Sequence, residues 1–382
     1  MWRFEVEDFS RLLRLWLPAC LQMLTDWTRP LLFNLFTSAN IKASLLQPAE
    51  AALEEDAVGL SVMSLNLVLF ATAYGFNGAI DSYASIAFGA GDNTELLAVL
   101  LRQLLLLCVL AVVAVALLVN AEAAFLIIGV RAELASRAAQ LLHLMGWAVP
   151  GDFIYDCAAR WMRGQQLHHL VSVCSAFALG LNLLVNLLLA SPLEPTRGPL
   201  LGLVTQNSVL PFLLFVAYYL GSARSQALAQ AALGSSKGQA LMDLRKALPS
   251  AKALIGRPLW RQMSTALAAM VWTCAELWAW EVQVFEAARL GTGNAAAYTL
   301  LSSTYSLLIC MFPVSVASAA GALIGEALGQ HQPERALRLL YSSCVLTLLF
   351  VLLYTTPIYF SRNALASLLC GGVEEVSSAY AR

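Results

Sequence analysis

Charge is scarce in this chain, and its scarcity excludes most soluble functions. Asp, Glu, Lys and Arg make up 12% of the 382 residues, about half the ~25% usual in a soluble domain, while 59% are hydrophobic. A soluble globule cannot cover that much apolar surface. The formal net charge of −1 leaves no basic excess for binding nucleic acid. The composition therefore predicts a polytopic membrane protein embedded in the lipid bilayer.

The motifs of enzymes and metal sites are also missing. The sequence contains no CxxC, HExxH, GxGxxG or Walker pattern, and its eight cysteines are scattered, mostly within apolar runs. We therefore expect neither an enzyme nor a metal site, and no cofactor. Without an ATP-binding module, any transport needs an ion gradient, with a proton or Na⁺ as the coupling ion.

Nine apolar runs are long enough to cross a hydrocarbon core of roughly 30 Å. They lack the even turn spacing of a β-barrel, so the fold class predicted is all-α. The run near 138–160 is the weakest, because it contains Asp152, Asp156 and Pro150. The charged start of the chain does not resemble a signal peptide, so the first run is expected to stay as a membrane anchor. The runs lie at about 13–37, 57–80, 97–120, 138–160, 170–190, 199–220, 263–288, 296–319 and 338–358.

The distribution of basic residues predicts the orientation. Most of the 23 Lys and Arg residues fall in the N-terminus, in the loops after the second, fourth and eighth runs, and in the polar segment 221–262. The positive-inside rule places these in the cytoplasm. The predicted organisation is a cytoplasmic N-terminus at 1–12, a six-helix bundle at 13–220, a cytoplasmic linker at 221–262 and a partial second bundle at 263–382.

Small residues end two of the runs and suggest an internal repeat. Gly89-Ala90-Gly91-Asp92 follows the second run, and Gly325 to Gln330 follows the eighth. The second and eighth spans are equivalent if a second bundle begins at the seventh span, as expected of repeat-built transporters.

The seventh run carries the most informative residues. An ionised carboxylate near the bilayer centre is costly and usually has water, a cation or a proton beside it, so Glu276 and Glu281 are candidate cation or proton sites. Trp278 lies close to both in the sequence and is a candidate cation–π surface for an organic cation. The alternatives are a carboxyl that bonds neighbouring helices and a tryptophan that packs against lipid.

Other polar residues in the runs have two interpretations each. Asp81 either lines a cavity or caps a helix. Asn182 and Asn186 share a helical face and, like Gln165, either line a substrate path or hydrogen-bond neighbouring helices; for the asparagines the second reading is favoured. Asp152 and Asp156 also share a face, where pairing with Arg160 is favoured over sharing a proton.

Several of these motifs together resemble the multidrug and toxic compound extrusion (MATE) family. They appear in family order from about Leu17 to Cys370. Ile86, Thr304 and Leu323 depart from residues that are common in the family. The matching stretches are Leu53 to Val58, Asp81 to Gly91, Arg163-Gly164-Gln165, Asn182 with Asn186, Glu276-x-Trp278-Ala279-x-Glu281, and Pro313 to Gly329.

The resemblance implies a fold and a function. The family has twelve spans in two six-helix bundles, so these nine runs imply a complete first bundle and an incomplete second one, as in a chain truncated after its ninth span. The function implied is proton-coupled antiport that exports organic cations and xenobiotics, with the acid at Glu276 alternating between cation and proton. Alternatives are an inactive truncated relative or membrane interaction protein, and a lipid-linked sugar flippase of related fold.

Overall fold

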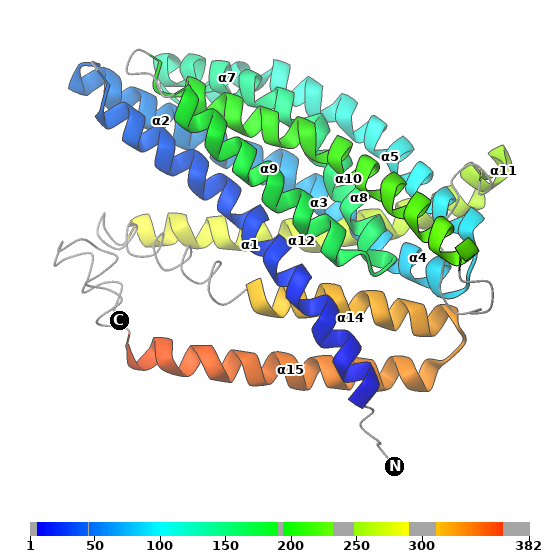
Figure 1. Cartoon of the computed structure of the whole chain (residues 1–382). Coiled ribbons are helices and arrows are strands. Elements are labelled where there is room, and N and C mark those ends of the chain that lie inside the picture. Colours follow the sequence, from blue (N-terminus) through cyan, green and yellow to red (C-terminus); the bar gives the residue numbers. More distant parts are fainter. Residues whose placement is uncertain (1–5, 45, 190–193, 232–247, 290–310, 362–382) are drawn as a thin grey trace.

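The computed structural model describes residues 6–44, 46–189, 194–231, 248–289 and 311–361, and all regular elements within those ranges are helical (Figure 1). The longest are α1, α5, α10, α12 and α15. In chain order the elements are α1 (Val6–Lys42), α2 (Pro48–Ser64), η1 (Leu65–Phe70), α3 (Ala71–Phe76), α4 (Gly78–Gly89), α5 (Asn93–Val119), α6 (Ala121–Ile128), α7 (Ala132–Met145), η2 (Gly146–Ala148), α8 (Val149–Gly164), α9 (His168–Leu188), α10 (Arg197–Ala231), α11 (Ala251–Leu254), α12 (Arg257–Arg289), α14 (Met311–Gly329) and α15 (Pro333–Phe360).

The described helices follow the apolar runs in order, although several boundaries differ. Within the described ranges, six helices are long and apolar enough to cross a membrane, judged by length and composition alone. The run near 138–160 is not one helix, because a short 3-10 turn, η2, separates α7 from α8. Much of the run predicted at 296–319 lies outside the described residues.

The second span is longer than predicted and changes its winding halfway. It continues from Pro48 through η1, α3 and α4 to Gly89, and η1 is a π-helical segment. Asp81, which was expected to end this span, therefore lies inside α4. A π-helical turn in a long helix is uncommon and frequently marks a functional region.

The first helix joins two packing groups. Its N-terminal part, including Leu12 and Trp16, packs against a small apolar cluster formed by α14 and α15. Its C-terminal part packs against α9 and α10 in the large core. Figure 1 shows α1 running from the upper helices down across α14 toward α15.

The ends of α4 and α14 repeat the same local structure. After α4, Gly91 has a left-handed φ of 70° and the Asp92 N–H donates to the Ala87 carbonyl at 3.1 Å. After α14, His331 has φ 58° and the Gln332 N–H donates to the Ala327 carbonyl at 2.8 Å. The same sequence offset separates each pair, but the ends of α6 and α8 make the same bond, from the Val130 N–H to the Phe125 carbonyl and from the Leu167 N–H to the Met162 carbonyl. The equivalence of the second and eighth spans therefore stays a prediction.

The ends of α4 and α14 cross at very short range. A Cβ added at Gly89 would lie 2.2 Å from the carbonyl oxygen of Glu326, and one added at Gly329 would lie 2.2 Å from that of Ile86. Only glycine at both positions allows the two backbones to approach this closely. The crossing brings the helices of the first bundle against α14.

Candidate functional site

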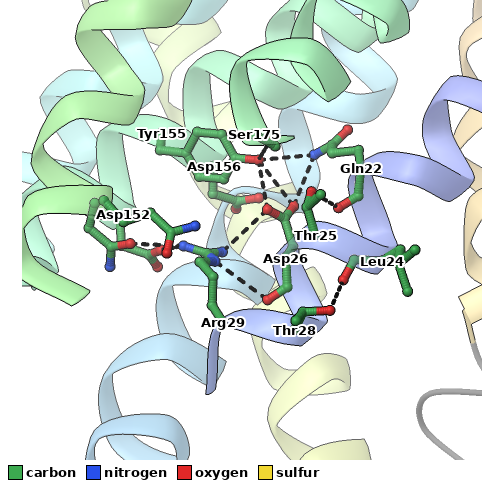
Figure 2. Close-up of polar contacts among 12 residues, drawn as sticks. Gln22, Leu24, Thr25, Asp26, Thr28, Arg29, Asp152, Tyr155, Asp156 and Ser175 are labelled. Atoms are coloured by element: carbon green, nitrogen blue, oxygen red, sulfur yellow. Dashed lines mark hydrogen bonds and ion pairs between the residues drawn. The ribbon is translucent and has the colours of Figure 1, made fainter. Parts of the chain in front are cut away.

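A buried polar cluster lies inside the first bundle, where α1 meets α8 and α9. Gln22, Asp26 and Arg29 recur at i, i+4 and i+7 on one face of α1. Opposite them, α8 supplies Asp152 and Tyr155 (Figure 2). In an apolar core these side chains must satisfy each other, because lipid offers no hydrogen-bonding partner.

Arg29 is the central cation of this cluster. Its Nη1 donates to Asp152 Oδ1 and to Asn207 Oδ1, each at 2.9 Å, and its Nη2 lies 3.6 Å from Asp26 Oδ1. The guanidinium carbon also lies 5.5 Å from the ring centroid of Tyr155, within cation–π range. A single arginine thus joins α1, α8 and α10.

Asp26 is held by neutral donors as well as by Arg29. The Tyr155 hydroxyl donates to its two carboxylate oxygens at 3.0 and 3.1 Å, and Gln22 Nε2 donates to Oδ2 at 3.1 Å. The Tyr155 oxygen also lies 2.7 Å from Ser175 Oγ on α9. Figure 2 shows these groups converging between the helices.

The charges in contact do not balance. Asp26 and Asp152 both lie within 4 Å of Arg29, at 3.6 and 2.9 Å, so two carboxylates share one guanidinium. A buried pair of acids with one cation in contact carries an excess negative charge when both acids are ionised. The buried Arg163 adds a positive charge that acts on Asp26 without being one of the ion pairs above.

A second ion-pair group adjoins the first along α8. Arg160 Nε lies 3.0 Å from both oxygens of Asp156, its Nη1 bonds Asp81, and its guanidinium stacks 4.2 Å from the Tyr74 ring centroid. The sequence expectation that Asp152 and Asp156 both pair with Arg160 is half wrong. Asp156 does so, whereas Asp152 pairs with Arg29 on another helix.

Hydrogen bonds continue from this group to α12. Asn77 Nδ2 donates to Asp156 Oδ2 at 3.0 Å, and Gln103 Nε2 donates to Asn77 Oδ1 at 3.2 Å. Gln262 Nε2 on α12 then donates to Gln103 Oε1 at 3.0 Å. A chain of buried amides therefore links the acids of the first bundle to the helix that carries Glu276.

The predicted seventh-span residues lie away from this cluster. Glu276 is exposed on the surface of α12, and the side chain of Glu281 is outside the described residues. Trp278 is 51% exposed and its Nε1 donates to the Leu67 carbonyl at 3.3 Å. Trp278 thus contacts the π-helical segment of the second span, and its role beside Glu276 in binding an organic cation stays a prediction.

The predicted amides lie at helix interfaces. Asn182 Nδ2 donates to Gln206 Oε1 on α10 at 2.7 Å, and Asn186 Nδ2 donates to Asn182 Oδ1 at 2.6 Å. Gln165 accepts a bond from the Tyr218 hydroxyl at 3.0 Å. All three amides are buried; Asn182 and Gln165 make interhelical hydrogen bonds to α10, whereas Asn186 bonds Asn182 on its own helix.

Sequence reasoning missed Asp26 and Arg29 as site residues. The available signal was an acid and an arginine within an apolar run, which in a membrane span is by itself a functional hypothesis. Within the described ranges, no group of three or more His, Cys, Asp or Glu side chains is placed to hold a metal ion. The contacts of the cluster are ion pairs and hydrogen bonds.

Comparison with protein families decides the classification. The model of the MatE family matches residues 51–188 and 268–381, which is more than half of the chain. The chain belongs to the MatE family. This confirms the resemblance that the sequence motifs indicated.

Curated relatives of this MatE protein include animal and fungal transporters. The chain is 26% identical over 286 residues to multidrug and toxin extrusion protein 1 of Xenopus tropicalis, covering 75% of this chain and 46% of the relative. The human protein of that name is 25% identical over 308 residues, covering 79% and 50%. An uncharacterized transporter, C4B3.13, of Schizosaccharomyces pombe is 24% identical over 355 residues, covering 88% and 61%. The chain spans about half the length of the animal relatives it matches.

Solved structures confirm the fold. The eukaryotic MATE transporter AtDTX14 has a TM-score of 0.72 at 16% identity, covering 98% of this chain and 78% of that chain. A MATE protein in the straight conformation has a TM-score of 0.73 at 19% sequence identity, with the same coverage of both chains. A MOP superfamily transporter from Pyrococcus furiosus has a TM-score of 0.73 at 18% identity, and the match covers 98% of this chain and 77% of that chain. For that transporter, the reverse polarity of the binding pocket suggests a different function. The chain is an all-α, multi-pass membrane protein of the MatE family.

Proposed function

We propose that this protein is a secondary active transporter that exports organic cations in exchange for protons. The observation that carries the proposal is the shared guanidinium of the first bundle, where Arg29 is in contact with both Asp26 and Asp152. Over both ion-pair groups four acids face three arginines, Arg163 included, and the one carboxylate in excess lets the site hold either a proton or a cation. Exchange between the two couples substrate movement to the proton gradient when each prefers a different conformation.

Family and fold support transport, and the charge of the cluster supports a cationic substrate. Because relatives of one fold differ in the polarity of their pockets, the site and not the fold argues for the substrate class. Acids outnumber arginines in both ion-pair groups, since Asp81 and Asp156 share Arg160 just as Asp26 and Asp152 share Arg29. An excess of acids attracts organic cations and repels anionic lipid-linked sugars.

The experiment is gradient-driven uptake of ethidium into proteoliposomes that contain the full chain. With an acidic lumen, protons leave and ethidium enters, so we expect uptake that collapses when the gradient is dissipated. A Na⁺ gradient without a pH difference separates the two coupling ions. The variants are Asp26→Asn and Glu276→Gln, and the control is Glu55→Gln, which changes an exposed acid on α2.

We expect Asp26→Asn to abolish uptake and Glu55→Gln to leave it unchanged, with all variants inserted at equal levels. Loss of uptake in Glu276→Gln shows that this exposed acid of α12 takes part in cation binding in addition to the Asp26 cluster. Uptake that persists in Asp26→Asn contradicts the role of the cluster. An unaltered chain that inserts but does not transport contradicts the function and favours a membrane interaction protein.

A further inference from the structure

A second polar cluster lies at the other end of α1, where it meets α14 and the α8–α9 turn. Its centre is Glu326, whose side chain is 6% exposed. Arg11 Nη2 donates to both carboxylate oxygens, at 3.1 and 3.3 Å, and Gln166 Nε2 donates to Oε2 at 2.7 Å. Gln330 Nε2 donates to Oε1 at 3.1 Å. Each oxygen of this acid therefore accepts more than one hydrogen bond.

The cluster continues to the start of α15. Gln330 Oε1 accepts a bond from Arg335 Nη1 at 3.3 Å, and Arg335 also holds Asp8 through Nε at 3.1 Å and Nη2 at 2.9 Å. Two ion pairs thus connect the N-terminal end of α1 with α14 and α15. Such contacts between separate helices fix one relative position of those helices.

The backbone around Glu326 is shaped for this contact. Gln166 has a left-handed φ of 63°, which is uncommon for a residue with a Cβ, and it ends α8. Beside it, Gly89 and Gly325 allow α4 and α14 to touch, since a Cβ at Gly325 would lie 1.9 Å from Ser85 Oγ. Gln166 and the glycine crossing therefore hold the same end of α14 against the first bundle.

The positive-inside rule places all these groups on one side of the membrane. They come from the start of the chain and from the segments after the second, fourth and eighth spans, the same basic set that this rule assigns to the cytoplasm. The contact consequently holds α14 against the first bundle on the side assigned to the cytoplasm.

We propose that Glu326, Arg11 and Gln166 form a latch that holds this end closed and that must open for the protein to face the cytoplasm. An alternating-access transporter has two discrete arrangements of its packed helices, and interface ion pairs that exist in only one of them set the balance between the two. Removing one member of the latch shifts the population toward the cytoplasm-open state without altering the Asp26 cluster.

Native cysteines report on this change. Cys20 is half-buried on α1, in contact with Ser315 of α14, so separation of the two helices exposes it. Cys157 is fully buried within α8 and becomes reactive only when the first bundle unfolds. The experiment measures the N-ethylmaleimide reaction of each cysteine by peptide mass spectrometry, with the full chain in lipid nanodiscs.

The variants are Glu326→Gln, Arg11→Met and the charge-exchanged pair Arg11→Glu/Glu326→Arg. The matched control is Glu334→Gln, which changes an exposed acid near the start of α15. We expect each single variant to raise the Cys20 labelling rate roughly tenfold, the exchanged pair to return it toward the unaltered rate, and the control to leave it unchanged. Cys157 stays unlabelled throughout.

Unchanged Cys20 labelling in both single variants overturns the latch. A parallel rise at Cys157 also overturns it, because the contact then only maintains the fold. An exchanged pair as reactive as the single variants shows that the ion pair is not the closing contact. The measurement uses neither substrate nor gradient, so its result is independent of the transport test.

Discussion

The glycine crossing of α4 and α14 gives a quantitative prediction about conformational balance. In Gly89→Ala, the new methyl carbon would lie 2.2 Å from the Glu326 carbonyl oxygen, 2.7 Å from its Cα and 2.8 Å from its carbonyl carbon. All three atoms are backbone, so no side chain can rotate away. Ordinary contact begins at 3.4 Å, so α4 and α14 must separate by about 1 Å.

The cost follows from the packing of the crossing. Overpacking of this kind destabilises the closed state by about 1–3 kcal/mol. The state in which α4 and α14 are apart is not destabilised. Because 1.4 kcal/mol is a factor of ten, the balance between closed and open states moves by about 5- to 150-fold toward the open one. The shift of Gly329→Ala is expected in the same range, since its Cβ would meet the Ile86 carbonyl at the same 2.2 Å.

Two measurements check this prediction. The labelling rate of Cys20 reports the separation of α1 from α14, and the midpoint of thermal unfolding reports overall stability. The matched control is Gly180→Ala in the exposed part of α9, where a Cβ meets nothing within 4 Å and alanine favours the helix. The reasoning is refuted if Gly89→Ala behaves like Gly180→Ala in both measurements, because the crossing then tolerates a Cβ.

Two further predictions concern the first bundle. Arg29→Met leaves Asp26 and Asp152 buried without the cation that contacts both, and is expected to lower the free energy of unfolding by about 3–5 kcal/mol. The double variant Arg29→Met/Asp152→Leu is expected to recover part of this loss. Thermal denaturation in detergent measures both, and an equal loss in the double variant contradicts the ion-pair origin. Asn182→Leu removes the hydrogen bond to Gln206 and is expected to lower the free energy of unfolding by about 1–2 kcal/mol, while the folded protein still transports cations. Loss of transport without loss of stability instead assigns Asn182 to the substrate path.

The helical framework could be predicted from the sequence because membrane spans need long apolar runs. The glycines that end the second and eighth spans were also visible in the sequence, and only glycine permits the crossing near Gly89. What the sequence did not reveal was the length of the second span. Its continuation past Asp81 depends on packing against α14, and local composition does not contain that information.

The polar cluster was harder to predict, because its pairs are separated by many residues. Asp152 has two arginines within reach of α8, and the local i+8 candidate, Arg160, is satisfied by Asp156 and Asp81. Its actual partner, Arg29, comes from the first helix. Spacing rules recognise neighbours along one helix, whereas the pairing of different helices is decided by tertiary packing.

The two polar clusters share α1, and this constrains how they can move. Arg11 and Asp26 are separated by about 22 Å along the helix axis at 1.5 Å per residue. Between them lies Pro18, which has no N–H for the backbone bond to Arg14, so the helix is softest there. The packing changes at the same place, since Trp16 belongs to the α14–α15 group and Asp26 to the first bundle. Separation of α14 from α1 can thus open the latch while the acid cluster keeps its partners, and a bend of α1 falls at Pro18, where one backbone bond is already missing.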